Sequence, residues 1–320
     1  MSPANMFDPE ISALFVAMAE SSDPAVEREV PQRGDVLGLR TMIDSGLAHL
    51  PHPDASNVSS TSYRATAPDG VEIELRWYSS DDDKRSDRPA VVYLHGGGRV
   101  AGSIEHYEKL VRYYVQETKV PVLQVDYRLA PEYTGTTAPE DGFAGLQWLI
   151  SHADELGVDP TRIAVMGDSG GGGVAAGTAI LARDRNINLA KQILIYPMLD
   201  DRNTEPDPVL EGMFGWTHDN NWTCWTAVLG DDFGCDDVSP ITAPARLRDF
   251  AGLPPAYVEV GDLDIFRDEC IAYAQQLYSV HISCELHILP GVIHGHDLIS
   301  FDLGVTQRTL ADRCKVISAL

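Results

Sequence analysis

The 320-residue sequence has few basic side chains and no long apolar run. Its 24 Lys and Arg face 48 Asp and Glu, giving a formal net charge of −24 at pH 7. This balance argues against a nucleic-acid or anionic-membrane partner, because phosphate binding needs clustered Lys and Arg. No stretch of about 18 apolar residues occurs, so no membrane span is expected. Residues 1–20 lack the early positive charge of a secretory signal, and we expect a cytoplasmic protein.

Cysteine is also scarce. The five cysteines are scattered, odd in number and without C-x-x-C spacing: Cys224, Cys235, Cys270, Cys284 and Cys314. This usage predicts buried free thiols in a reducing compartment rather than a disulfide framework.

Hydrophobic periodicity divides the chain. Residues 1–50 show helical spacing and no strand signal, and then an Asp69-Gly70 hairpin turn follows. The apolar face of the first expected helix consists of Ile11, Leu14, Phe15 and Met18. Short runs rich in Val, Ile, Leu and Tyr lie at 90–98, 120–128, 162–170, 191–198, 254–262 and 283–291, and helical patterns lie at 106–118, 142–156 and 267–280. About eight strands alternating with helices predict an α/β fold, a mostly parallel sheet flanked by helices on both faces.

One long interval breaks this alternation. Residues 201–240 are rich in Trp and Asp and carry no buried-strand signal. An interval of this length in a compact domain is usually functional or has helices of its own, so we expect a lid or cap. Its Met213, Phe214 and Trp216 fit an apolar substrate pocket, although the inner packing of a cap would have the same composition.

Residues 165–177, VMGDSGGGGVAAG, follow an apolar run and contain four consecutive glycines. Gly167 to Gly171 fit G-x-S-x-G, the turn that holds a nucleophilic serine, here Ser169, between a strand and a helix. The spacing Gly171-x-Gly173-x-x-Ala176 also fits a loose dinucleotide fingerprint. That fingerprint should start directly at the strand end, where Ser169 replaces the second glycine, so we favour the nucleophile turn over a cofactor loop or a plain packing turn.

A second glycine motif ends an earlier apolar run. His95-Gly96-Gly97-Gly98 matches the H-G-G-G loop that accompanies such a serine and supplies backbone N–H groups to an oxyanion. We expect the donors to be the N–H groups of Gly97, Gly98 and Gly170.

Taken together, these motifs resemble the hormone-sensitive-lipase-like, bacterial family IV esterases of the α/β-hydrolase superfamily. The resemblance covers about residues 90–300 and rests on HGGG at 95–98, DYRLAPE at 126–132, GDSGGG at 167–172, SP at 239–240, DIFRDE at 264–269 and GVIHG at 291–295. It implies an α/β-hydrolase core (51–200 and 241–320) and a helical cap built from an N-terminal segment (1–50) and an insertion (201–240).

The serine needs an acid and a base, in the chain order Ser, Asp or Glu, His. Asp262, Asp264 and Asp268 compete for the first place, and His281, His287, His294 and His296 for the second. The resemblance selects Asp264, the leading acid of the family's D-P-L-R-D-E motif, and His294, the histidine of its G-x-x-H-G pattern. A metal site at HGHD, 294–297, is the alternative, but it would leave Ser169 unexplained.

Several positions depart from the family, among them the continuation YTGTTAPED at 133–141, after DYRLAPE. Arg99 stands where a bulky apolar residue is usual, Gly170 replaces alanine, and His296 replaces phenylalanine. A cation at position 99 lies at the mouth of the expected acyl pocket. We hypothesise that Arg99 either pairs with a cap carboxylate, the interpretation we favour, or recognises a polar substrate.

The resemblance implies a serine carboxylesterase that acts on short- to medium-chain esters of small molecules, with no metal and no organic cofactor. Lactone opening, acyl transfer or deacetylation would use the same residues, and the sequence does not separate them. A non-catalytic receptor on the same scaffold is disfavoured, because Ser169, Asp264 and His294 are all present. The sequence leaves a homodimer open.

Overall fold

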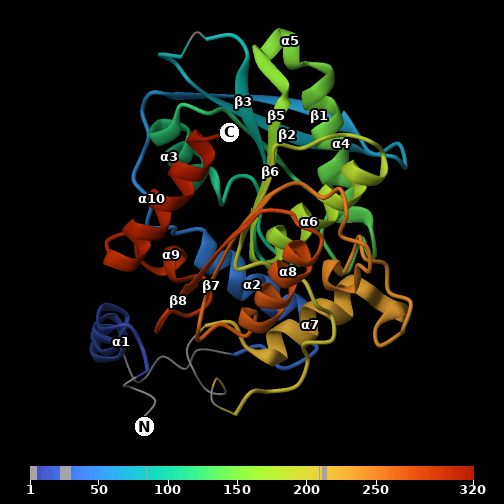
Figure 1. Cartoon of the computed structure of the whole chain (residues 1–320). Coiled ribbons are helices and arrows are strands. Elements are labelled where there is room, and N and C mark those ends of the chain that lie inside the picture. The colour runs from blue at the N-terminus through green and yellow to red at the C-terminus, as the bar shows by residue number, and fades with distance from the viewer. Residues whose placement is uncertain (1–5, 22–29, 84, 209, 211–214) are drawn as a thin grey trace.

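A computed structural model describes residues 6–21, 30–83, 85–208, 210 and 215–320 (Figure 1). An eight-stranded sheet crosses the molecule in the order β1-β2-β4-β3-β5-β6-β7-β8. The strands are β1 (Val58–Thr66), β2 (Glu72–Ser80), β3 (Arg88–Leu94), β4 (Val122–Val125), β5 (Val158–Asp168), β6 (Lys191–Ile195), β7 (Ala256–Gly261) and β8 (Cys284–Leu289). All neighbours from β4 to β8 run parallel, so the predicted mostly parallel sheet is confirmed.

The antiparallel part is the N-terminal hairpin. Strands β1 and β2 pair in register from Val58 opposite Ser80 to Thr66 opposite Glu72, around the predicted Asp69-Gly70 turn. Strand β1 is the sheet edge and is mostly exposed and rich in Ser and Thr, whereas β3, β4 and β7 are buried along almost their whole length. The central strands are apolar throughout because helices cover both of their faces. The edge strand β1 is polar because much of it faces solvent.

Helices cover both faces of the sheet. They are α3 (Glu108–Thr118), α4 (Thr137–Ser151), α5 (Ala153–Leu156), α6 (Ser169–Asp184), α8 (Arg267–Ser279), α9 (His296–Ile299) and α10 (Gly304–Ser318). Helix α3 packs with α10, and α4 packs with α6 beside β5 and β6. The helix expected at 142–156 differs from this arrangement: α4 begins earlier and ends at Ser151, and His152 separates it from α5.

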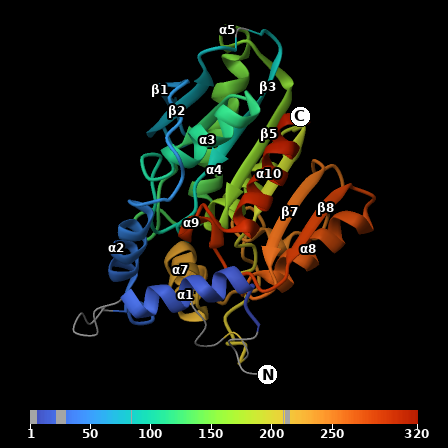
Figure 2. The same cartoon turned by 90° about the vertical axis from the view of Figure 1, so that its left-hand side faces the viewer.

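The remaining helices lie at the carboxyl ends of the strands, as Figure 2 shows. They are α1 (Pro9–Ser21), α2 (Val36–Leu47) and α7 (His218–Leu229), followed by the short 3-10 turns η2 (Gly230–Asp232) and η3 (Pro244–Arg246). Helix α2 contacts α7, so the N-terminal segment and the 201–240 interval meet over the sheet. The expected apolar face of α1 buries Ile11 against Leu289, Val292 and Leu303.

Two expectations from composition, on membrane spans and on cysteines, can be compared with the structure. No described helix has the length and apolar character needed to cross a bilayer. All five cysteines are free thiols, but the expectation that they are buried is wrong for Cys235, which is exposed, and Cys314 is only partly covered.

Candidate active site

The motifs with candidate catalytic residues meet where the parallel strands of the sheet end. The HGGG loop follows β3, Ser169 follows β5, Asp264 follows β7, and His294 follows β8. Because these strands are parallel, their carboxyl ends lie together, which is where open α/β sheets bind ligands.

Ser169 stands on a sharp turn between β5 and α6. Its φ is +52°, a left-handed conformation that non-glycine residues rarely adopt and that costs on the order of 1–3 kcal/mol. The flanking glycines are required sterically. A Cβ at Gly167 would lie 2.3 Å from the Gly171 carbonyl oxygen, and a Cβ at Gly171 would lie 2.2 Å from the carbonyl oxygens of Leu94 and His95. Strand and helix can therefore crowd around the serine only because both positions lack a side chain.

The structure brings the serine, the histidine and the selected aspartate into one hydrogen-bonded chain. Ser169 Oγ lies 2.8 Å from His294 Nε2, and His294 Nδ1 lies 2.7 Å from Asp264 Oδ2. Asp264 is 1% exposed, and its other oxygen accepts the Phe266 N–H at 2.9 Å. The rings of Tyr196 and Phe266 meet the imidazole in edge contacts at 4.8 and 5.0 Å between centroids. These contacts fix the orientation of both the carboxylate and the ring.

The competing acids and histidines have other positions or partners. The partners are Gly291 N–H for Asp262, Arg267 for Asp268, Glu285 for His287 and Thr309 for His296. His281 lies just before β8 begins, at the opposite end of the strands from Ser169. The structure therefore does not bring His296 and His294 to a shared ligand, and no group of three His, Cys, Asp or Glu suited to a metal occurs among the described residues.

The HGGG loop closes over the start of α6. Gly97 and Gly98 have φ of +115° and +62°, and the Gly97 carbonyl accepts the N–H groups of Val100 and Ala101, which makes the turn tight. A Cβ at Gly170 would lie only 2.8 Å from the backbone N of Gly98. The three glycines expected to act on an oxyanion thus lie around the same point beside Ser169.

The expected pocket residues divide into three groups. Trp216 lies over the loop: its ring edge comes within 3.0 Å of a Cβ built at Gly98, and its ring centre lies 6.1 Å from that of His294. Met213 and Phe214 lie outside the described residues. Arg99 is 1% exposed, and no carboxylate of the described chain lies within 4 Å of it. The favoured pairing with a cap carboxylate is therefore not found in the part of the chain that the structure describes.

Sequence reasoning missed the contacts that hold this loop from α2. Arg40 donates to the carbonyl of Val100, and Asp44 accepts the Gly102 N–H at 2.8 Å. The other guanidinium nitrogens of Arg40 pair with Glu132 at 2.7 and 2.8 Å. About 60 residues separate the partners in sequence, and neither helical spacing nor any motif signals the contact.

Two buried polar networks behind the site were also missed. Asp168, directly before the serine, accepts the hydroxyls of Tyr93 and Tyr107 at 2.7 and 2.8 Å, and burial raises its pKa to about 6. On the other side, Tyr196 donates to Asp297 at 2.6 Å, and Asp297 pairs with Arg313. Burial alone would raise the pKa of Asp297, but the charge of Arg313, together with His296 and the hydrogen bonds from Arg313 and Tyr196, holds that pKa below its usual range.

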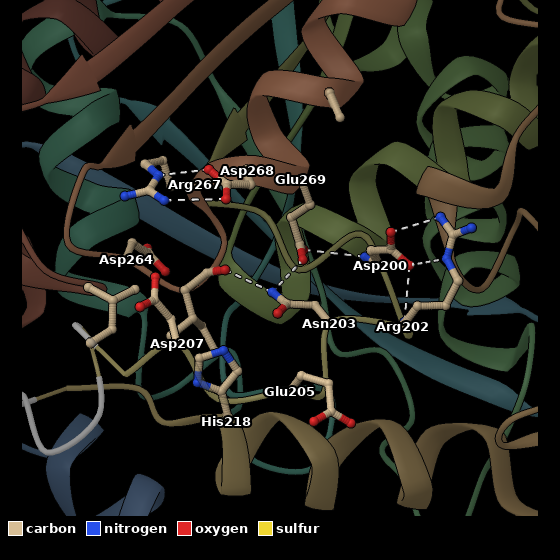
Figure 3. Close-up of a pocket in the computed structure, with 13 residues that line it drawn as sticks. Asp200, Arg202, Asn203, Glu205, Asp207, His218, Asp264, Arg267, Asp268 and Glu269 are labelled. Carbon is tan, nitrogen blue, oxygen red and sulfur yellow. Dashed lines mark hydrogen bonds and ion pairs between the residues drawn. The ribbon is translucent and has the colours of Figure 1, made fainter.

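A polar cavity of about 380 Å³ lies beside Asp264 (Figure 3). Glu269 and Asn203 are hydrogen-bonded to each other in its wall, and the Asp200–Arg202 and Asp268–Arg267 pairs neutralise much of its acidic lining. Ser169 is not among the lining residues. The cavity therefore adjoins the serine site but does not contain the serine.

Comparisons with known proteins agree with this architecture. The family described as the alpha/beta hydrolase fold matches residues 91–298. Carboxylesterase NlhH of Mycobacterium tuberculosis is 35% identical over 225 residues, 66% of this chain and 67% of the relative. Ethyl acetate hydrolase of Pseudomonas putida is 32% identical over 232 residues, 72% and 73% of the two chains. The solved structure of a bacterial heroin esterase superposes with a TM-score of 0.88 at 33% identity and covers 99% of both chains. The chain belongs to the α/β-hydrolase fold family, in its hormone-sensitive-lipase-like branch, among relatives named as esterases.

Proposed function

We propose that this protein is a serine carboxylesterase in which Ser169 is the nucleophile, His294 the general base and Asp264 the acid that orients it. One observation carries the proposal: the continuous chain from Ser169 Oγ to His294 at 2.8 Å and from His294 to Asp264 at 2.7 Å. A nucleophile in hydrogen-bond reach of a base that a third group orients is the signature of covalent acyl transfer.

The geometry supports the following sequence of steps. Ser169 Oγ attacks the ester carbonyl while His294 Nε2 takes its proton, and Asp264 stabilises the resulting imidazolium through Nδ1. The N–H groups of Gly97, Gly98 and Gly170 hold the oxyanion of the tetrahedral intermediate. His294 then returns the proton to the leaving alcohol. Water repeats the steps on the acyl-enzyme and releases the acid. None of these steps draws on a metal or an organic cofactor.

We infer a preference for short- to medium-chain acyl groups. Trp216 lies within contact of Gly98 and near His294, which limits the space above the oxyanion loop. A relative in Pseudomonas putida named ethyl acetate hydrolase fits small acyl groups. We also assign residues 1–50 and 201–240 to a cap over this site, because α2 and α7 meet there.

The direct test is Ser169→Ala, assayed on p-nitrophenyl acetate, butyrate and octanoate. We expect turnover to fall at least about 10³-fold, because removing the nucleophile of such a triad leaves only the oxyanion hole and binding. Ser279→Ala, at the exposed end of α8, is the control and should keep wild-type rates. A fluorophosphonate probe should label the wild type and the control but not Ser169→Ala.

Near wild-type turnover in Ser169→Ala would refute the mechanism. Lactones and alcohol acceptors in the same panel separate hydrolysis from lactone opening and acyl transfer, which would use the same residues. Absence of both turnover and labelling in the wild type would favour a receptor instead.

A further inference from the structure

Arg99 is a buried cation placed directly after the oxyanion loop. It is 1% exposed and has a φ of +63°. Its Nε donates to the Gly170 carbonyl at 3.3 Å, and its Nη1 donates to the Thr242 carbonyl at 2.7 Å. A Cβ at Gly173 would lie 2.3 Å from its Nη2, so that glycine makes the space for the guanidinium. The side chain therefore lies along the Gly170–Gly173 face of α6.

The part of the chain that the structure describes offers this charge no close counter-ion. No carboxylate of the described residues lies within 4 Å of the guanidinium, and Nη2 has no hydrogen-bond partner among them. Glu269 interacts with the guanidinium only from further away. Burial raises the pKa of its carboxyl well above the usual range, and that carboxyl already accepts the N–H groups of Leu199 and Asp200. The Trp225 ring lies 5.1 Å from the guanidinium carbon and adds a cation–π interaction.

Burial lowers the pKa of Arg99 to about 10, which still leaves it charged at neutral pH. An uncompensated buried cation is costly, and the cost is recovered only where a negative charge arrives. The nearest place where the proposed reaction develops a negative charge is the oxyanion position beside the Gly170 N–H.

The arrangement couples the guanidinium to that position. Arg99 donates to the carbonyl of the same residue, Gly170, whose N–H is proposed to bind the oxyanion. The N-terminus of α6 adds partial positive charge of the same sign. One hydrogen bond on each side of the Gly170 peptide separates the guanidinium from the proposed oxyanion, roughly 8 Å in all. At an effective dielectric constant near 20, two full unit charges at that distance interact by an amount worth about 30-fold in rate, and a partly developed oxyanion charge gives an effect on the order of ten-fold.

We propose that Arg99 is a positioning residue that stabilises the transition state through its charge, by holding the HGGG loop on α6 and adding positive potential at the oxyanion. The inference rests on the proposed function. Recognition of a polar substrate is the competing role. Two of the three guanidinium nitrogens are bonded to backbone carbonyls, and the free one lies at Gly173, one helical turn beyond Gly170, which favours the charge role.

The test compares Arg99→Met, Arg99→Gln and Arg99→Lys with the wild type, and Arg64→Met, an exposed arginine on the edge strand β1, is the control. Active sites are counted by fluorophosphonate titration, so that kcat refers to competent serines only. We expect Met and Gln to lower kcat about ten-fold on p-nitrophenyl acetate with KM within two-fold, and Lys to restore most of the loss. The inhibition constant of a trifluoromethyl ketone, which forms an anionic adduct on Ser169, should rise by the factor by which kcat/KM falls.

Three results would overturn the proposal: wild-type kcat in Met and Gln, a Lys variant as slow as Gln, or a loss confined to esters with polar or anionic acyl groups. If Met does not fold, the comparison of Gln with Lys decides alone. Failure of the wild type to react with the fluorophosphonate would refute the serine mechanism itself and is distinguishable from all three.

Discussion

At the scale of single residues, the site depends on glycines, because no side chain fits at these positions. Gly167 and Gly171 make room for one another and for the end of β3, and this lets Ser169 keep a positive φ. The HGGG loop also approaches the turn, since a Cβ at Gly170 would lie 2.8 Å from the backbone N of Gly98. The reactive geometry is therefore set by backbone contacts, which tolerate a methyl group poorly.

Gly170→Ala tests how tightly this loop is seated. Alanine is usual at this position in the family that the sequence resembles, yet a Cβ here would lie 2.7 Å from the backbone N of Arg99 and 2.8 Å from that of Gly98. We expect the loop to be pushed off the oxyanion position, and kcat to fall by roughly 10- to 100-fold, since each lost oxyanion donor costs about 10²–10³. Steady-state kinetics and a thermal melt measure the two effects.

Gly46→Ala is the matched control, because a Cβ at this position in α2 meets nothing within 4 Å. It should keep wild-type kcat and raise stability by about 0.5–1 kcal/mol, the helix-propensity gain. Full activity in Gly170→Ala would show that the loop relaxes without cost and would contradict the expectation.

At the scale of elements, α2 does more than cover the sheet. Arg40 donates to the carbonyls of Val100 and Ala130, and Asp44 accepts the Gly102 N–H. One helix of the N-terminal segment thus holds the start of the loop that follows Gly98 and also the loop after β4. The Arg40–Glu132 pair is half-exposed at its carboxylate, and such pairs contribute little by themselves. Of the Arg40 contacts, the hydrogen bonds to the carbonyls of Val100 and Ala130 are the ones that hold the loops beside the site.

Arg40→Met should therefore lower kcat several-fold, because the Val100 carbonyl loses its donor and the oxyanion loop loses a restraint. Glu132→Gln is the control: it removes the surface ion pair and leaves both carbonyl contacts in place. We expect kinetics close to wild type for Glu132→Gln and similar melting temperatures for both variants. Equal loss in the two variants would assign the effect to the ion pair and not to the loop contacts.

The elements also show how far sequence reasoning extends. Buried strands such as β3 and β7 are predictable because both faces are covered, which demands continuous apolar runs. The G-x-S-x-G motif predicts Ser169, the family resemblance selects Asp264 and His294, and the structure brings the three together. Contacts between distant segments, such as Arg40 with Val100, leave no periodicity in either segment. The direction of a long side chain such as Arg99 depends on space provided elsewhere, here by Gly173.

At the scale of the whole molecule, the C-terminal helix is tied to the site through buried charges. Arg313 of α10 pairs with Glu259 of β7 and with Asp297 of α9, which lies three residues after His294. All three charged groups are buried. If one partner is removed, the other charge stays buried without compensation, which is strongly destabilising. Because the same charges join α10 to the loop of His294, we expect these two segments to unfold together.

The charge of the whole molecule gives a further prediction. A net charge of −24 repels itself in the compact state, and few Lys and Arg are present to balance it. Salt screens this repulsion, since the Debye length falls from about 30 Å at 0.01 M to about 8 Å at 0.15 M. Raising NaCl from 0.01 to 0.2 M at pH 8 should therefore increase the melting temperature by roughly 1–2 °C, which corresponds to on the order of 1 kcal/mol for a chain of this size. Near pH 5.5, closer to the isoelectric point of about 4.6, the increase should shrink, because carboxylate protonation removes the repulsion that salt screens. A melting temperature that falls with salt at pH 8 would mean that favourable ion pairs, rather than net repulsion, dominate the electrostatics of this fold.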